Sequence, residues 1–362
     1  MIGQEIDRQN SSEDYSEVSS LDQLTYTNNE CKVRLTENIV MTGAVTVNNG
    51  NRLTIDLNGH TLTAAENSRA FFIQNGALTI EDSGSTGVIQ GSGTVTGNGG
   101  AIWMSSSDSN NALTLTGGTI RGFTATDGGG VYVSGGSFKM TDGTISTCNA
   151  TNAGGGVYVS SGSFEMSGGS IENCTAHEGA GVKVLASSGK ASFSMSGSGE
   201  IKNCNQDGVS IAAIGGTSEF SMSGGTIEDN SGFGVWVDNG SAVMSGGSVK
   251  GSERYDIYIG SRAALTVKNT QVGGTVLNLG KITGQGSAEF TGTVENSGYA
   301  VAEITGCKIH RIEHRSPYKG TITGSTWDEY VYLLGRSWPT AKIPSEAGES
   351  ITPSRFQAIY HR

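Results

Sequence analysis

Two neighbouring stretches of the sequence are nearly identical: GGGVYVSGGSFKMTDGTISTCNA at residues 128–150 and GGGVYVSSGSFEMSGGSIENCTA at residues 154–176. Each contains three short apolar segments, which in the second copy lie at 157–159, 164–166 and 170–172. Within each segment apolar residues alternate with others, which is typical of a strand with one buried face. Glycine and serine separate the segments and suit the sharp turns between short strands. The block therefore predicts three strands joined by tight corners.

The same unit recurs along most of the chain. Its first strand has the pattern V-x-V, and successive first residues are 22 to 31 positions apart: Val45, Phe71, Ile102, Val131, Val157, Val182, Val209, Val235 and Ile257. Three short strands cannot bury their apolar face alone, but repeats that stack on one another can. The sequence therefore predicts an all-β fold, a single-stranded right-handed parallel β-helix of about ten or eleven coils with capped ends.

Stacking in this register predicts ladders of equivalent side chains. Three inward ladders are expected: Phe138, Phe164, Phe193 and Phe220; Met140, Met166, Met195, Met222 and Met244; and Ile120, Ile145, Ile171, Ile201, Ile227 and Val249. One outward ladder alternates in charge: Glu172, Lys202, Glu228 and Lys250. Opposite charges on adjacent strands stabilise the pairing and help to fix its register.

The ends of the chain differ in composition from the repeat. Residues 1–30 are polar and acidic, and we expect an N-terminal cap there, with a short helix starting near Ser20. All four prolines lie in the last 46 residues. We therefore divide the chain into a cap at 1–30, a β-helix at 31–310 and a C-terminal cap or irregular tail at 311–362.

Charge and hydropathy exclude several classes of protein. A net charge of −11 argues against binding to nucleic acid, because phosphates need a basic surface. No apolar run is long enough for a membrane helix, so we expect no membrane span. The first residues, MIGQEIDRQ, do not form a secretory signal. We expect a leader to have been removed and the protein to be extracellular or on the cell surface.

Neither metal nor cofactor chemistry is expected from the sequence. The five cysteines cannot all pair, and Cys148, Cys174 and Cys204 follow the third strand as a buried file that Asn230 continues. The stretch His310–His314 has the spacing H-x-x-E-H of a zinc site, but it aligns with strand and corner residues, with Ile312 at the position of Cys148.

Catalytic residues are also not expected. We expect Asp56, Glu81, Asp82 and Asp127 not to recur at one position of adjacent coils, as a groove with paired acids would require. Enzymatic activity remains an alternative that the sequence does not favour.

An outward aromatic file is the most suggestive feature. The middle residue of each V-x-V segment points away from the core, and most of these residues are aromatic. The candidate ligand-binding residues are Phe72, Trp103, Tyr132, Tyr158, Lys183, Trp236 and Tyr258. Outward rings in a file can pack against sugars or another protein surface. Alternatively, they stack on each other and stiffen the sheet, or the C-terminal tail covers them.

Two motifs carry a resemblance to a known family. The segments Ile145–Ala150 followed by Gly154–Val157, and Gly99–Ile102, resemble the F-x-x-N and G-G-A-I repeats of chlamydial polymorphic outer-membrane proteins. More broadly, residues 45–310 resemble right-handed, pectin-lyase-like β-helix repeats of bacterial surface proteins. The motifs differ in having Ile for the usual Phe and mostly Cys for the usual Asn.

The resemblance implies a surface-displayed, adhesin-like rod. Its partner would be a glycan or a protein of a host or cell surface. A passive structural stalk is the first alternative. A polysaccharide lyase or glycoside hydrolase is the second, although no acid cluster of those enzymes maps onto this chain.

Overall fold

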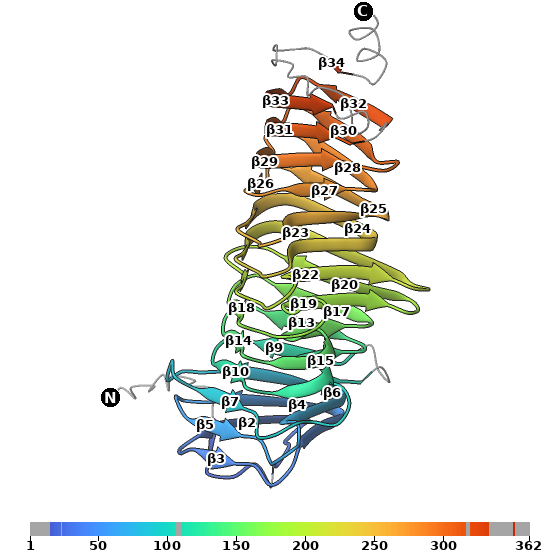
Figure 1. Ribbon diagram of the computed structural model, residues 1–362. Coiled ribbons are helices and arrows are strands. Elements are labelled where there is room, and N and C mark those ends of the chain that lie inside the picture. Colours follow the sequence, from blue (N-terminus) through green and yellow to red (C-terminus); the bar gives the residue numbers. More distant parts are fainter. Residues whose placement is uncertain (1–14, 23, 106–109, 316–318, 333–349, 352–362) are drawn as a thin grey trace, which may run out of the picture.

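The computed structural model describes residues 15–22, 24–105, 110–315, 319–332 and 350–351, and they form a right-handed parallel β-helix. Figure 1 shows a rod of stacked coils, with the N-terminal coils at the bottom and the C-terminal coils at the top. The predicted all-β fold class is confirmed. The described residues contain no α-helix, and hence no helix that could span a membrane.

Three strands per coil give the rod three faces. Face A is built from the V-x-V strands β8 (Ile102–Met104), β12 (Val131–Val133), β16 (Val157–Val159), β19 (Val182–Ala186), β22 (Val209–Ala213) and β27 (Val276–Asn278). Face B is built from β1 (Ser16–Val18), β2 (Glu30–Leu35), β9 (Ala112–Leu115), β13 (Ser137–Met140), β17 (Gly162–Met166), β20 (Lys190–Met195), β28 (Lys281–Gln285), β30 (Val301–Thr305) and β32 (Lys319–Thr323). Face C is built from β3 (Ile39–Val40), β5 (Thr61–Thr63), β7 (Val88–Gln90), β10 (Thr119–Arg121), β14 (Thr144–Ser146), β18 (Ser170–Glu172), β21 (Glu200–Lys202) and β26 (Gln271–Val272).

Longer strands bend around the corners and join the faces into one sheet. They are β4 (Val45–Asp56), β6 (Phe71–Glu81), β23 (Thr217–Glu228), β24 (Phe233–Lys250), β25 (Tyr255–Lys268), β29 (Glu289–Asn296), β31 (Lys308–His314) and β33 (Thr326–Tyr332). A separate pair, β11 (Thr124–Asp127) and β15 (Asn149–Ala153), lies between faces C and A. Strand β34 (Ser350–Ile351) pairs antiparallel with β32.

The predicted register is confirmed on all three faces. On face A, Val131 pairs with Val157, and the same alignment runs from Val45 to Ile257. On face B, the rings of Phe138, Phe164 and Phe193 stack with centroids 4.5 and 4.8 Å apart. These rings are fully buried, so the stacked phenylalanines fill the core at the spacing that the paired strands set.

The outward charge ladder on face C is also present. Lys202 lies 3.8 Å from Glu172 on the preceding coil, and Lys250 lies 3.1 Å from Glu228. The Lys202 ammonium also contacts Glu200 of its own strand at 2.6 Å. These pairs are partly solvated, so their main effect is to disfavour a slipped register.

The cysteine file forms where the chain turns after face C. Asn173 and Asn203, with φ of 54° and 55°, turn the backbone so that Cys174 and Cys204 point inward. Both thiols are fully buried and free, as is Cys148. Asn230 continues the file and accepts a hydrogen bond from the backbone N–H of Cys204 at 3.0 Å. The prediction of a buried packing file is confirmed.

Beyond Ile257 the coils become shorter, which the sequence analysis did not anticipate. Val276, Val294 and Ile312 are successive partners on face A, so each coil spans only 18 residues there. Faces C and A then run together in single strands such as β29 and β31. The placement of Ile312 at the position of Cys148 is therefore wrong, because Ile312 begins a face A segment and the cysteine corner has been lost.

The ladder also extends past both expected boundaries of the β-helix. Strand β33 pairs in parallel with β31, so coils continue to Tyr332, beyond residue 310. At the other end β1 pairs with β2, before residue 31. The described residues around Ser20, 15–22 and 24–30, contain no helix, and Leu21 lies buried against the core.

Candidate binding face

Face A carries the outward file in the predicted order. Parallel pairing places the middle residues of successive strands next to one another: Thr46, Phe72, Trp103, Tyr132, Tyr158, Lys183, Ser210, Trp236 and Tyr258. All seven candidate residues therefore lie in one continuous file, which continues through Leu277 and Glu295 to Glu313.

Exposure divides this file into two aromatic groups. The rings at 72, 103, 132, 236 and 258 are partly exposed. In the middle, Tyr158 and Lys183 are only 7% and 3% exposed, and Ser210 is buried. Burial also raises the pKa of the Tyr158 hydroxyl well above its usual value. The centre of the file is thus covered by its neighbours, and surface rings remain on either side of it.

The N-terminal aromatic group, Phe72, Trp103, Tyr132 and Tyr158, is held together by its own contacts. Phe72 and Trp103 have centroids 4.9 Å apart, and Tyr132 stacks on Tyr158 at 5.1 Å. The Arg69 guanidinium lies 4.7 Å from the centroid of Trp103, and burial lowers the pKa of Arg69. Ring faces in this group are therefore largely occupied by other rings or by Arg69.

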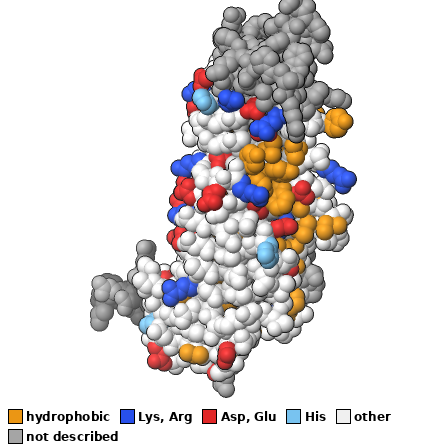
Figure 2. Space-filling model, in the orientation of Figure 1, with side chains coloured by type: hydrophobic (Ala, Val, Ile, Leu, Met, Phe, Trp, Pro, Cys, Tyr) orange, Lys and Arg blue, Asp and Glu red, His pale blue; other side chains and the backbone are white. Residues whose placement is uncertain are grey.

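The C-terminal aromatic group, Phe233, Trp236, Tyr255 and Tyr258, is arranged differently. Trp236 meets Tyr258 edge to face, at 87° and 6.2 Å, and meets Phe233 at 61° and 5.6 Å. The indole N–H of Trp236 is buried and has no hydrogen-bond acceptor among the described residues. Figure 2 shows a band of hydrophobic side chains at the height of β24 and β25, with charged side chains around it.

Lys183 links the buried centre of the file to this C-terminal group. Its ammonium lies 2.7 Å from Glu178 Oε2 and 3.0 Å from Ser210 Oγ. The same ammonium lies 5.7 Å from the ring centroid of Trp236. Asp207 lies close by, and burial raises the pKa of its carboxyl group. A buried cation here is satisfied by one carboxylate, one hydroxyl and the face of an aromatic ring.

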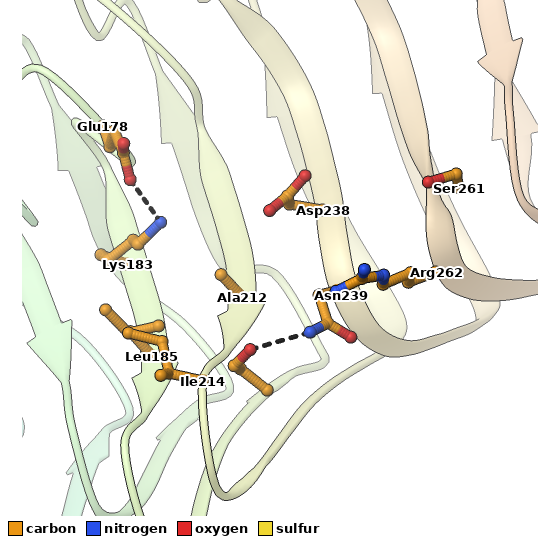
Figure 3. A pocket seen from close by; sticks show the side chains of 10 residues that line it. Glu178, Lys183, Leu185, Ala212, Ile214, Asp238, Asn239, Ser261 and Arg262 are labelled. Carbon is orange, nitrogen blue, oxygen red and sulfur yellow. Dashed lines mark hydrogen bonds and ion pairs between the residues drawn. The ribbon is translucent and has the colours of Figure 1, made fainter.

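A pocket of about 570 Å³ opens beside Lys183, at the corner between faces A and B. In Figure 3, Glu178 and Lys183 lie on one side of it, Arg262 and Ser261 lie on the opposite side, and Asp238 lies between them. The remaining lining residues are Leu185, Ala212, Ala213, Ile214 and Asn239. Apolar and small side chains thus form part of the wall, and charged groups of both signs surround it.

The pocket was not predicted from the sequence, although a signal for it was present. Leu185 and Asp238 are the next outward positions after Lys183 and Trp236 on the same strands, two residues further along. These residues begin a second outward file, two positions after the aromatic one. Following this second file as well would have placed Leu185, Ala212 and Asp238 next to one another. Glu178 lies four residues before Val182, as Ala153 lies before Val157, and the two residues pair in parallel. The repeat therefore places its backbone, but the acidic side chain at this position is not part of the repeated pattern.

The expectation that acidic residues do not share a position in adjacent coils is wrong for Asp56 and Glu81, which are paired on face B. The other candidate chemistry from the sequence is dispersed. In the H-x-x-E-H stretch, His310 is exposed and contacts Asp328 at 2.9 Å, whereas His314 points into the core. The two histidines therefore lie on opposite sides of strand β31. Across the described ranges, no group of three or more His, Cys, Asp or Glu residues is arranged to hold a metal ion.

Comparison with known proteins supports the fold and does not identify a ligand. A family model described as a right handed beta helix region matches residues 109–272. No curated protein and no solved structure matches the chain. The matched region includes the two nearly identical repeats at 128–150 and 154–176 and all the residues that line the pocket. The pocket therefore lies within the segment that the family model covers.

Proposed function

We propose that this protein is a β-helical binding rod, displayed on a cell surface or secreted, that holds a glycan against face A. The observation that carries this proposal is the outward file on face A, in which partly exposed aromatic rings lie beside a pocket with polar and charged walls. Aromatic faces pack against the C–H surfaces of sugars, and the polar groups of a pocket fix orientation. The stacked strands hold these groups in a fixed register.

Binding to a glycan array tests the proposal. Wild type should bind at least one class of glycan. At least one of two paired variants should lose that binding: Trp103→Ala with Tyr132→Ala, or Trp236→Ala with Tyr258→Ala. Circular dichroism and thermal unfolding establish that each variant is folded. The matched control is Tyr299→Ala, which removes a ring that is 94% exposed at a turn outside the file.

The array also separates the alternatives. A passive stalk predicts no bound glycan, and that result would overturn the proposal. Glycan binding that survives in both paired variants would remove the aromatic file as the site. Cleavage of the bound glycan, measured as new reducing ends or unsaturated products, would instead indicate a lyase or hydrolase, with Glu178 and Asp238 as the first carboxylates to replace.

A further inference from the structure

We propose that the ligand of face A is an uncharged sugar chain that lies over Trp236 and Tyr258 and places its end in the pocket lined by Glu178, Lys183, Asp238 and Arg262. This inference rests on the proposed glycan-binding function and specifies its position and ligand class. Nothing in the family match assigns either of them.

The first step concerns which aromatic group is free to bind. In the N-terminal group, Tyr132 and Tyr158 stack nearly in parallel at 20°, and Arg69 lies over Trp103. In the C-terminal group, Trp236 and Tyr258 meet edge to face at 87°, so the two rings do not cover each other by stacking. Phe233 lies 5.1 Å from Tyr258 and the Lys183 ammonium lies 5.7 Å from the centroid of Trp236, so each ring keeps only part of its surface for a ligand. The C-terminal group is preferred because Trp236 and Tyr258 do not stack on each other and because Trp236 lies two residues from Asp238 of the pocket.

The second step is continuity between rings and pocket. Trp236 and Asp238 are successive outward residues of β24, and Lys183 and Leu185 have the same relation on β19. The aromatic group and the pocket are therefore neighbouring strips of one face. A ligand longer than one sugar that lies on the rings is therefore placed next to the pocket.

The third step concerns charge. The pocket contains two cationic side chains, Lys183 and Arg262, and two carboxylates, Glu178 and Asp238. The Lys183 ammonium already contacts Glu178 and Ser210, so it is not a free site for an acidic ligand. Sugar hydroxyls both donate and accept hydrogen bonds, which suits walls that offer both kinds of partner. A polyanionic chain would meet two carboxylates on a protein with a net charge of −11.

The fourth step is size. The pocket volume of about 570 Å³ lies within the range of about 300–1,000 Å³ that is usual for small-molecule sites. Ala212 and Ala213 contribute short side chains to the lining, and Leu185 and Ile214 contribute larger apolar ones. This combination fits a sugar ring, which has an apolar face and a polar edge.

Titration calorimetry with defined oligosaccharides tests the inference. The probes are gluco-, manno- and galacto-oligosaccharides as uncharged chains and oligogalacturonate as the acidic chain. At least one uncharged series should bind, and oligogalacturonate should bind at least about tenfold more weakly. Arg262→Gln and Asp238→Asn should each weaken binding about tenfold, the loss expected for one hydrogen-bonded group. Both side chains are exposed, so these variants should fold normally.

Trp236→Ala with Tyr258→Ala should abolish binding, and Tyr299→Ala should leave it unchanged. If glycans bind but only Trp103→Ala with Tyr132→Ala removes the binding, the inference is wrong and the proposed function stands. Tighter binding of oligogalacturonate, or no effect of Arg262→Gln and Asp238→Asn, would also overturn the inference alone. If no glycan of any class binds, the proposed function itself fails.

Discussion

The side chain of Lys183 illustrates how one residue connects folding with the binding face. It follows Tyr158 and precedes Ser210 in the outward file of face A, and it is only 3% exposed. An ammonium at such a site is tolerated because Glu178 and Ser210 satisfy it and because its stem packs along the file. The position of Lys183 beside the pocket thus depends on an ion pair between a buried ammonium and a half-exposed carboxylate.

The first prediction concerns this ion pair. Glu178→Gln should lower the free energy of unfolding by about 2 kcal/mol, because it leaves a buried ammonium without its carboxylate. The loss is limited because Glu178 is half exposed and water can approach. Lys183→Met keeps the apolar stem without the charge and should change stability by less than about 1 kcal/mol. Urea unfolding measures both, and equal losses in the two variants would contradict the account.

The second prediction concerns His314, which continues an inward file after Asn278 and Asn296. Burial lowers the pKa of His314 to about 3. The unfolded chain takes up this proton near pH 6.5, whereas the folded chain does so only near pH 3. Above pH 6.5 this group therefore does not reduce the free energy of unfolding. As the pH falls from 6.5 towards 3, the free energy of unfolding decreases by about 1.4 kcal/mol per pH unit.

His314→Asn is the matched variant, because asparagine occupies the same position in the two preceding coils. Urea unfolding between pH 7 and pH 4 should show a smaller loss of stability in the variant than in wild type. Identical pH profiles for the two proteins would show that His314 is not buried in its neutral form.

Among the elements, the corners vary more than the strands. The strand segments of the three faces keep their register from coil to coil, because each has one buried face and a one-residue slip would expose it. The corners only have to connect the strands. Between faces C and A the connection shortens from the cysteine corner after Ile145 to the single strand β31. This is why the repeats at 128–176 predicted the ladders correctly but not the end of the 26-residue period.

The same distinction explains which parts of the site could be predicted. The aromatic file follows from strand alternation, so the sequence alone places Trp103 next to Tyr132. Burial of Tyr158 and Lys183 depends on side chains from corners such as the one that carries Glu178. The backbone of that corner keeps its register, because Glu178 pairs with Ala153, but the residue type at this position changes from coil to coil. The covered centre of the file therefore could not be read from the repeat.

The third prediction follows from the 18-residue coils. Deleting residues 276–293 should give a folded protein one coil shorter, because Val294 then takes the place of Val276 beside Ile257. Deleting residues 276–284 removes half a coil and should prevent the C-terminal coils from stacking. Far-UV circular dichroism and cooperative thermal unfolding distinguish the outcomes. Two deletions of equal stability would contradict the coil boundaries.

At the scale of the whole molecule, the parallel pairing of successive coils positions every group of the proposed binding face. The aromatic file, the pocket and the buried Lys183 lie where they do because residues about one coil apart in sequence are neighbours in space. Figure 1 shows the consequence, a rod whose faces run along its length. A rod of this kind can present several contact groups to an extended ligand at a spacing set by the strands, about 4.8 Å per coil.

Disulfide trapping between coils tests this ladder most directly. Lys139 and Glu165 are exposed partners on adjacent strands of face B, and the native cysteines are all buried. Lys139→Cys with Glu165→Cys should form a disulfide rapidly under mild oxidation, since paired Cα atoms lie within bonding range. Lys139→Cys with Ser194→Cys, two coils apart, should remain reduced. Failure of the first pair to cross-link, or equal cross-linking of both, would contradict the stacked coils on which the binding face depends.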